Sequence, residues 1–424
     1  MADFNESTSR VLTIMAAPRL PLELLERIID DVATDYVDNL SSIKACALVC
    51  YSFLPLCRKH IFASVTLKAY SSPTSDDLNN LLSNSPHLAV YIQKLVYRVN
   101  EKEFVAKKFS WLSPMFKKLV KLQKLSFSPS AGRKIDWMSS SVRKALLPLL
   151  HLPTLTSIRL LAFRNFALED LAGCVNLKEL EIGWLECSND VGNFLETLPT
   201  TPPMLERLTI NDGNIRPVQQ LCHAQRPDGK PIIDFSLLRK ITAEVARLDS
   251  MMELFGMCRN LYEIDLLSMS LTFLPLRSFD LTFIVQREID PDPILSTTSL
   301  KGLFTMLKPS LPTLVNIYIR CSIEVNETDD GPLAGLCHEL EKMVGQNVVE
   351  TIELLIWVFP GCDCARWGEL DDVLMGSPEG WPALRKVSLL FKVFDSDKTL
   401  RELPMTKLVE SERVQFDFEV RVLQ

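Results

Sequence analysis

The clearest pattern in the chain is a triplet of apolar positions that recurs between residues 92 and 389. In each copy an apolar residue is followed three positions later by a second one, and two positions after that by a third. The ten copies are Ile92/Leu95/Tyr97, Leu122/Leu125/Phe127, Leu155/Ile158/Leu160, Leu177/Leu180/Ile182, Leu205/Leu208/Ile210, Leu238/Ile241/Ala243, Leu261/Ile264/Leu266, Leu314/Ile317/Ile319, Val349/Ile352/Leu354 and Leu384/Val387/Leu389. The last two positions alternate with other residues, mostly polar, which is typical of a short strand with one buried face.

Segments with helical apolar spacing lie between the triplets. Examples are Leu78/Leu81/Leu82, Phe194/Leu195/Leu198 and Leu333/Leu336/Leu340/Met343. One strand and one helix cannot bury their own apolar faces, so neighbouring units must stack. The sequence therefore predicts an α/β solenoid with a concave parallel sheet and outer helices. The alternative is a doubly wound α/β domain, which also alternates strands and helices but does not require a repeated triplet.

The copies recur about every 29 residues if the long gap between the seventh and eighth copies contains a divergent one, for which Leu276/Phe279/Leu281 is the candidate. This period and the Leu-x-x-Leu-x-Leu spacing resemble leucine-rich repeats. The asparagine that a stricter repeat carries after the third apolar residue is mostly missing. We therefore expect an irregular solenoid, with loops at residues 215–235 and 287–299, where Pro, Gly and Asp cluster.

Residues 20–67 have helical periodicity in place of the repeat. A first helix is predicted from Pro21, because proline is tolerated at the first helical position. A second helix contains the run Ala45–Cys50, which is apolar all round and is expected to be buried on several sides. A third, short helix is predicted after Pro55, and residues 64–67 have the character of a first strand. The apolar stripe of the first helix consists of Leu24, Leu25, Ile28, Ile29 and Val32.

The same residues resemble an F-box. The resemblance is carried by Leu20-Pro21, by the stretch Lys44-Ala45-Cys46-Ala47-Leu48-Val49-Cys50-Tyr51-Ser52-Phe53 and by His60-Ile61-Phe62. This form is similar to the F-box proteins that fungi carry in large numbers. The match covers residues 20–67 of a chain of 424 residues, and an F-box followed by leucine-rich repeats is a familiar pairing.

The resemblance implies a three-helix module that binds the Skp-type adaptor of a cullin-RING ubiquitin ligase. The adaptor-binding residues that it implies are Leu20, Pro21, Leu24, Ile28, Ile29, Leu48, Val49 and Phe53. The alternative for each residue is that it packs the module against the first repeats. The sequence departs from the family in a longer loop between the first two helices and in Phe62, where many members have tryptophan.

The predicted organisation is a disordered N-terminal tail at 1–19, an F-box at 20–67 and a solenoid at 68–424. The resemblance implies the substrate receptor of an SCF-type ligase: the F-box joins the adaptor and cullin scaffold, and the solenoid holds an unknown protein substrate. Such a receptor is not an enzyme, because it brings a target close to the conjugating enzyme without contributing a reacting group. The alternative is a leucine-rich-repeat scaffold that acts outside a ubiquitin ligase.

The chain contains no familiar catalytic motif. Residues 376–380 have the serine of a Gly-x-Ser-x-Gly turn one place early, there is no phosphate-binding Gly-x-x-x-x-Gly-Lys-[Ser/Thr] loop, and His338-Glu339 lacks a second histidine. Cys362 and Cys364 could form a zinc site with Cys337 or His338, but a spacing of one residue is too short for the usual zinc motifs. No metal or other cofactor is expected.

Composition narrows the class of protein further. Hydrophobic residues at 47% and charged residues at 23% exclude a wholly disordered or collagen-like chain. The net charge of −7 disfavours nucleic acid as a partner. Eleven cysteines, an odd number within apolar stretches, favour reduced thiols in the cytoplasm or nucleus. The short run Val11–Ala17 follows acidic residues and does not suit a signal peptide, and no stretch approaches the length of a membrane span.

Residues that flank the second and third triplet positions should point away from the core, onto the concave side of the sheet. They are basic near the N-terminal end, at Lys94, Arg98 and Lys124, and mostly acidic midway, so a partner with a basic patch would be attracted. The alternative is that exposed strand positions are polar only for solubility. The residues predicted to bind the target are Glu179, Glu181, Trp184, Arg207, Glu263, Asp265, Tyr318 and Arg320.

Overall fold

A computed structural model divides the chain into two compact units, unit 1 at residues 1–64 and unit 2 at residues 65–424. The structure describes residues 20–34, 39–68, 72–99, 112–129, 134–138, 140–188, 198–213, 216–245, 251–267, 300, 302–323, 332–358, 367–377, 379–393 and 405–422. The predicted tail at 1–19, the predicted loop at 287–299 and the cysteines Cys362 and Cys364 lie outside these residues. The division between the units falls three residues before the end of the predicted F-box at residue 67.

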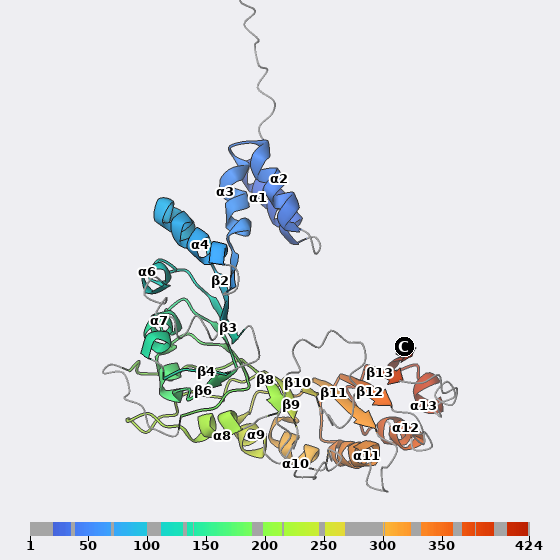
Figure 1. Cartoon of the computed structure of the whole chain (residues 1–424). Coiled ribbons are helices and arrows are strands. Elements are labelled where there is room, and N and C mark those ends of the chain that lie inside the picture. Colours follow the sequence, from blue (N-terminus) through green and yellow to red (C-terminus); the bar gives the residue numbers. More distant parts are fainter. Residues whose placement is uncertain are drawn as a thin grey trace, which may run out of the picture. The chain divides into compact units, whose positions relative to one another are not determined.

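The described residues of unit 1 form three helices, drawn in blue in Figure 1: α1 at Leu22–Thr34, α2 at Asn39–Val49 and α3 at Phe53–Ile61. Its core is made by Ile29, Ile43 and Cys57, one from each helix. Partly buried apolar residues pack around these three: Val32, Ala33, Cys46, Ala47, Phe53, Leu56 and Ile61. Pro55 lies in the first turn of α3, where a missing backbone N–H costs no helical hydrogen bond.

The expectation that the run Ala45–Cys50 is buried on several sides is wrong. Cys46 and Ala47 are half-buried, whereas Leu48 is 88% exposed and Val49 is 69% exposed. A helix in a three-helix unit has only two neighbours, so part of an apolar run must remain in solvent. The end of α2 is therefore a surface of unit 1 and not part of its core.

The described part of unit 2 is organised around a sheet of 12 strands whose spatial order follows their order in the chain. The strand pairs with a described register are parallel. The strands are β1 (Ser64–Lys68), β2 (Lys94–Val99), β3 (Lys124–Pro129), β5 (Ser157–Leu161), β7 (Glu179–Gly183), β8 (Arg207–Gly213), β9 (Lys240–Val245), β10 (Glu263–Leu267), β11 (Asn316–Ile323), β12 (Thr351–Val358), β13 (Lys386–Val393) and β14 (Gln415–Val422).

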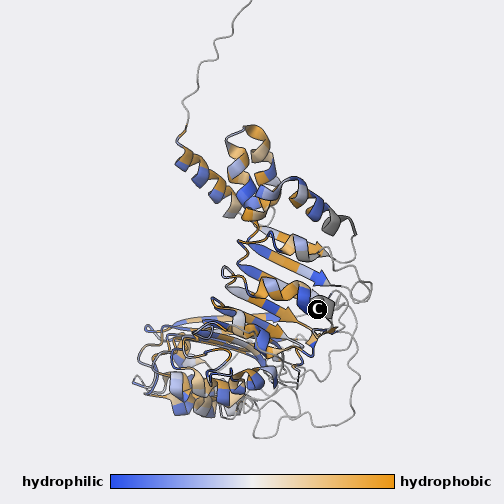
Figure 2. Ribbon diagram, turned by 90° about the vertical axis from the view of Figure 1, so that its left-hand side faces the viewer, coloured by the Kyte–Doolittle hydropathy of each residue, from blue (hydrophilic) through white to orange (hydrophobic). Residues whose placement is uncertain are grey.

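All ten predicted triplets form strands of this sheet, and their second and third positions lie opposite each other from strand to strand. Ile352, for example, is opposite Ile317 on one side and Val387 on the other, and all three are buried. Figure 2 shows the resulting alternation of apolar and polar residues along the strands. The prediction of an α/β leucine-rich-repeat-like fold with a long parallel sheet is confirmed at this level.

The candidate divergent copy at Leu276/Phe279/Leu281 lies outside the described residues. One strand of the sheet was not predicted by the repeat. The triplet failed to indicate β14, because Arg413 stands where the first apolar residue would be. Phe416 and Phe418 nevertheless continue the second and third positions, opposite Val387 and Leu389.

Helical segments connect the strands and lie along one side of the sheet, as Figure 1 shows for α8 to α13 beside β8 to β13. They are α4 (Ser72–Asn84), α6 (Leu112–Phe116), α7 (Ser140–Leu150), α8 (Arg216–His223), α9 (Met252–Met257), α10 (Leu303–Leu307), α11 (Pro332–Met343), α12 (Trp367–Met375) and α13 (Thr406–Val409), with 3-10 turns η1 (Pro86–Tyr91), η3 (Leu168–Gly173) and η5 (Lys308–Ser310). The predicted loop at 215–235 begins instead with α8.

A small second sheet of β4 (Ile135–Asp136) and β6 (Phe163–Arg164) interrupts the repeat. Beside it, the buried carboxylate of Asp170 accepts a hydrogen bond of 2.7 Å from the Trp137 indole. The Arg143 guanidinium donates two more to the same carboxylate, at 2.8 and 2.7 Å. Both carboxylate oxygens of Asp170 are thus occupied, as a buried charge requires.

Candidate functional site

Unit 1 exposes many large apolar side chains for its size. We call them the exposed apolar group: Leu20, Leu22, Leu24, Ile28, Leu40, Leu48, Val49 and Tyr51. Tyr51, like Leu48, is 88% exposed. Single apolar residues at a surface need no explanation, but eight of them among the described residues of unit 1 make this unit a candidate for protein binding.

The residues implied for adaptor binding mostly belong to this surface. Leu20, Pro21, Leu24, Ile28, Leu48 and Val49 are exposed. Leu24 and Ile28 lie one helical turn apart, so both face the same side of α1. Ile29 and Phe53 differ from the others: Ile29 belongs to the core and Phe53 packs half-buried against it. Ile29 and Phe53 therefore belong to the packed interior of unit 1, and the expectation that the buried Ile29 contacts the adaptor directly is wrong.

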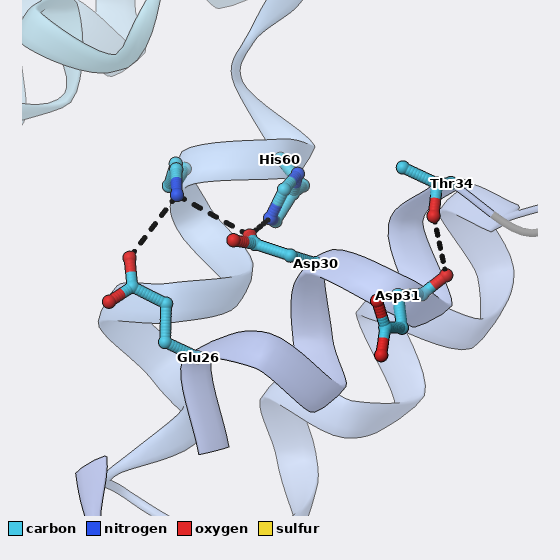
Figure 3. Close-up of polar contacts among 6 residues, drawn as sticks. Glu26, Asp30, Asp31, Thr34 and His60 are labelled. Atoms are coloured by element: carbon cyan, nitrogen blue, oxygen red, sulfur yellow. Dashed lines mark hydrogen bonds and ion pairs between the residues drawn. The ribbon is translucent and has the colours of Figure 1, made fainter. Parts of the chain in front are cut away.

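Polar contacts on the other side of α1 fix its orientation against α3 (Figure 3). The Asp30 carboxylate lies 2.7 Å from Nε2 of His60 and 3.3 Å from Nζ of Lys59. Nζ of Lys59 also lies 3.2 Å from the Glu26 carboxylate. The hydrogen bond with His60 lowers the pKa of Asp30, and the contact with Glu26 raises the pKa of Lys59. With this side tied to α3, the stripe that holds Leu24 and Ile28 remains in solvent.

Unit 2 carries a second candidate surface, the side of its sheet that alternates with the buried triplets. We call it the open face. Its first row across the strands runs Lys94, Lys124, Ser157, Glu179, Arg207, Lys240, Glu263, Asn316, Thr351, Lys386 and Gln415. Its second row runs Val96, Ser126, Arg159, Glu181, Thr209, Thr242, Asp265, Tyr318, Glu353, Ser388 and Asp417.

Ion pairs between neighbouring strands connect the charges of this face. Glu179 lies 2.9 Å from Arg207, and Glu181 lies 3.0 Å from Arg159. Further pairs join Lys240 to Glu263 at 2.5 Å, Arg320 to Asp265 at 2.8 Å and Lys386 to Glu353 at 3.6 Å. The acidic side chains predicted midway are therefore partly neutralised by cations, and the face offers alternating charges to a partner.

Asp265 is the most unusual residue of the open face. It is buried, and one of its carboxylate oxygens, Oδ1, has no hydrogen-bond partner among the described residues. Burial raises its pKa even though Arg320 contacts the other oxygen. Tyr318, which lies opposite Asp265 on β11, also has its pKa raised by burial. Keeping the Asp265 carboxylate charged in the folded chain therefore costs free energy.

Trp184 follows the end of β7 and is 42% exposed. Its backbone has a φ of 50°, which a bulky residue rarely adopts. The preceding Gly183 has no room for a side chain, since a Cβ there would lie 2.9 Å from both the Asn211 carbonyl oxygen and a Leu161 methyl. Strands β5 and β8 therefore pack closely against Gly183, directly before Trp184. An exposed tryptophan is well suited to anchor an interface.

Sequence reasoning placed Glu179, Glu181, Glu263 and Asp265 on the open face but missed two of their partners, Arg159 and Lys240. Both flank predicted triplet positions, so the period-two alternation was the signal that could have identified them. It also missed Asn211, whose side-chain amide donates to Glu181. Which charge pairs with which depends on register between strands, and a single sequence does not specify that.

Metal-binding clusters, reactive thiols and membrane-spanning helices would mark further sites in the parts of the chain that the structure describes. No cluster of three or more His, Cys, Asp or Glu side chains there could hold a metal ion. The cysteines within those parts form no disulfide, and burial raises the pKa of Cys187, Cys222 and Cys258 to about 12. Thiols with such a pKa are poor nucleophiles. No helix in the described ranges is long and apolar enough to cross a bilayer.

Comparisons with known proteins add little to this description. No family model matches the chain, and no curated protein matches it in sequence. Among solved structures, it is similar to an internalin from Listeria monocytogenes with a TM-score of 0.29 and 10% sequence identity, over 95% of this chain and 94% of that chain. A TM-score this low supports no inference about function or fold.

Proposed function

We propose that the protein is the substrate receptor of an SCF-type cullin-RING ubiquitin ligase, in which unit 1 is an F-box that binds the Skp-type adaptor. The observation that carries the proposal is the exposed apolar group on a three-helix unit whose sequence resembles an F-box. Leu24 and Ile28 on α1 and Leu48 and Val49 at the end of α2 are its main binding residues. Apolar side chains at this level of exposure gain most by being buried against another protein.

Unit 2 would then hold the protein to be ubiquitinated, with the open face as its binding surface. The alternating charges suit selection among partners more than high affinity, since ion pairs at an interface mainly affect association rate and specificity. Trp184 would supply an apolar anchor. The receptor contributes proximity and no reacting group. The described cysteines form no disulfide, which suits the cytoplasm or nucleus, where such ligases act.

A leucine-rich-repeat-like scaffold that acts outside a ubiquitin ligase is the second candidate. The long parallel sheet suits protein binding whether or not unit 1 contacts a ligase. The two candidates differ in what unit 1 binds, because a scaffold of this kind would not recruit a cullin.

The double substitution Leu24→Asp with Ile28→Asp tests the docking surface. Two carboxylates on this stripe would have to be desolvated in the complex, so we expect adaptor affinity to fall at least about a hundredfold. The control Thr34→Asp adds a charge at an exposed polar position of the same helix and should bind normally. Binding is measured by calorimetry, with circular dichroism to check folding. Unchanged affinity of the folded double variant would place the docking surface elsewhere.

A further inference from the structure

Strand β14 is the last strand of the sheet, and β13 is its one neighbour among the described strands. The Gln415 N–H donates to the Arg385 carbonyl at 2.8 Å, so it points toward β13. Backbone groups alternate in direction along a strand. The N–H and C=O groups of Phe416, Phe418, Val420 and Val422 therefore point away from β13, to the edge with which no other described strand pairs. An edge of this kind is a template for pairing with another chain.

The apolar side of β14 is also incompletely covered. Phe418 and Val422 lie opposite Leu389 and Val393 of β13. The two residues of β13 are buried, whereas Phe418 is 39% exposed and Val422 is 48% exposed. The row of apolar side chains that is buried on β13 is therefore partly exposed on β14. A further strand alongside β14 would bury these two side chains as β14 buries those of β13.

The polar side of β14 alternates in charge at its C-terminal end. Glu419 and Arg421 are exposed and pair along the strand, at 2.6 and 2.9 Å between guanidinium nitrogens and carboxylate oxygens. Two residues of opposite charge, two positions apart on one face, are self-complementary when two copies of the strand run antiparallel. In a parallel arrangement in register, the same residues would face like charges.

We propose that β14 pairs antiparallel with β14 of a second copy of this chain, with Val420 at the centre of the pairing. In this register Glu419 lies opposite Arg421 of the second copy, and Arg421 lies opposite its Glu419. Phe418 lies opposite Val422 of the second copy on the apolar side. The outward N–H and C=O groups of Phe418, Val420 and Val422 then meet their counterparts as hydrogen-bonded pairs.

Charge distinguishes this register from its neighbours. Centring the pairing on Glu419 would put Asp417 opposite Arg421 of the second copy on both sides of the axis, but it would also put two glutamates directly opposite each other. Centring it on Phe418 would put Asp417 opposite Glu419 of the second copy on both sides of the axis. Like charges directly opposite are destabilising, so the register centred on Val420 is the favoured one. This inference is independent of the proposed function, since it concerns neither unit 1 nor the open face of the other strands.

The helix that precedes β14 is held by contacts that the pairing leaves in place. The buried carboxylate of Asp371 on α12 accepts hydrogen bonds of 2.8 Å from the N–H groups of Lys407 and Leu408. These bonds fix α13, which directly precedes β14. A preformed edge loses little conformational entropy on pairing, and this favours association.

Sedimentation velocity of the full chain at concentrations up to about 100 µM tests the proposal. The wild-type chain should show a concentration-dependent dimer. Arg421→Glu places glutamates opposite each other at two positions, so the dissociation constant should rise about tenfold or more. Exchanging both charges, Glu419→Arg with Arg421→Glu, keeps the pair within the strand and restores opposite charges across the axis. It should return the dissociation constant to near the wild-type value.

Gln415→Lys is the matched control, because it changes charge on the same face of β14 outside the proposed pairing, and it should leave the dimer unchanged. Thermal unfolding of each variant checks the fold. A monomer at every concentration would overturn the proposal, as would a dimer insensitive to Arg421→Glu. Failure of the exchanged variant to recover would overturn the register, since a pairing centred on Glu419 would then place two arginines opposite each other. Adaptor binding by the same variants should be unaffected.

Discussion

At the scale of single residues, two buried aspartates in unit 2 show how differently a carboxylate can be accommodated. Asp170 has both oxygens occupied by the Trp137 indole and the Arg143 guanidinium. Asp265 has one oxygen on Arg320 and one without a partner among the described residues. The carboxylate of Asp170 is fully hydrogen-bonded in the folded chain, whereas that of Asp265 is only partly hydrogen-bonded. No sequence pattern distinguished them, because both depend on contacts with distant segments.

This contrast makes a quantitative prediction. Asp170→Asn should lower the free energy of unfolding by about 2 to 4 kcal/mol, because it leaves Arg143 without its counter-charge and gives Trp137 a weaker acceptor. Asp265→Asn should change it by less than about 1 kcal/mol, because removing the charge also removes its desolvation. Chemical denaturation at neutral pH measures both. Equal losses for the two variants would contradict the assignment.

The pH dependence of stability gives a second readout for the same pair. Burial raises the pKa of Asp265, so the folded chain binds a proton at this residue more tightly than the unfolded chain. Stability from this residue therefore increases as the pH falls from the folded pKa toward the ordinary value of 3.8. Asp265→Asn should remove that increase. If stability depends on acid pH in the same way in the wild type and in Asp265→Asn, the pKa of Asp265 is not raised in the folded chain.

At the scale of elements, the apolar triplet predicted strands well because its cause is local and repeated. Ten copies indicated ten strands, and each buries the predicted side chains. The same reasoning failed where neighbours decide the outcome. The run Ala45–Cys50 looked buried from composition, yet α2 has too few neighbours to cover Leu48 and Val49. Strand β14 was missed because Arg413 breaks the triplet, although its register continues from β13.

The ion pairs between strands allow the open face to be tested without disturbing the sheet. Reversing a single charge would leave its partner opposed by a like charge, whereas exchanging a pair keeps the attraction and inverts the field presented to solvent. Arg159→Glu with Glu181→Arg should therefore leave the melting temperature nearly unchanged and reduce recovery of the natural target. Quantitative mass spectrometry of proteins captured by the full chain measures recovery. Undiminished recovery with the exchanged pair would remove this part of the open face from target binding.

At the scale of the whole molecule, sequence predicted the division into a helical unit and a repeat unit but could not reveal which surfaces remain exposed. The apolar stripe of α1 contains both core and surface residues: Ile29 lies in the core, and Leu24 and Ile28 lie outside it. Only the packing of α1 against α2 and α3 separates them. The paired charges of the open face depend likewise on strands far apart in sequence.

The two proposals assign a different task to each surface. In the proposed receptor, unit 1 would bind the ligase and unit 2 would bind a target, and the proposed pairing of β14 would join two such chains. A dimer would bring two target-binding faces into one assembly, which raises the effective concentration of the second site once the first is occupied. The dimer is not required for the receptor role, so the two proposals succeed or fail separately.

The most direct test of the central claim is co-purification of the full chain with a Skp-type adaptor and a cullin scaffold expressed together. The proposed function predicts a complex of all three proteins, in which capture of the cullin depends on the adaptor. The complex should be lost with Leu24→Asp and Ile28→Asp and retained with Thr34→Asp. Wild-type protein that captures neither the adaptor nor the cullin, or the adaptor without the cullin, would contradict a ligase receptor and favour the scaffold.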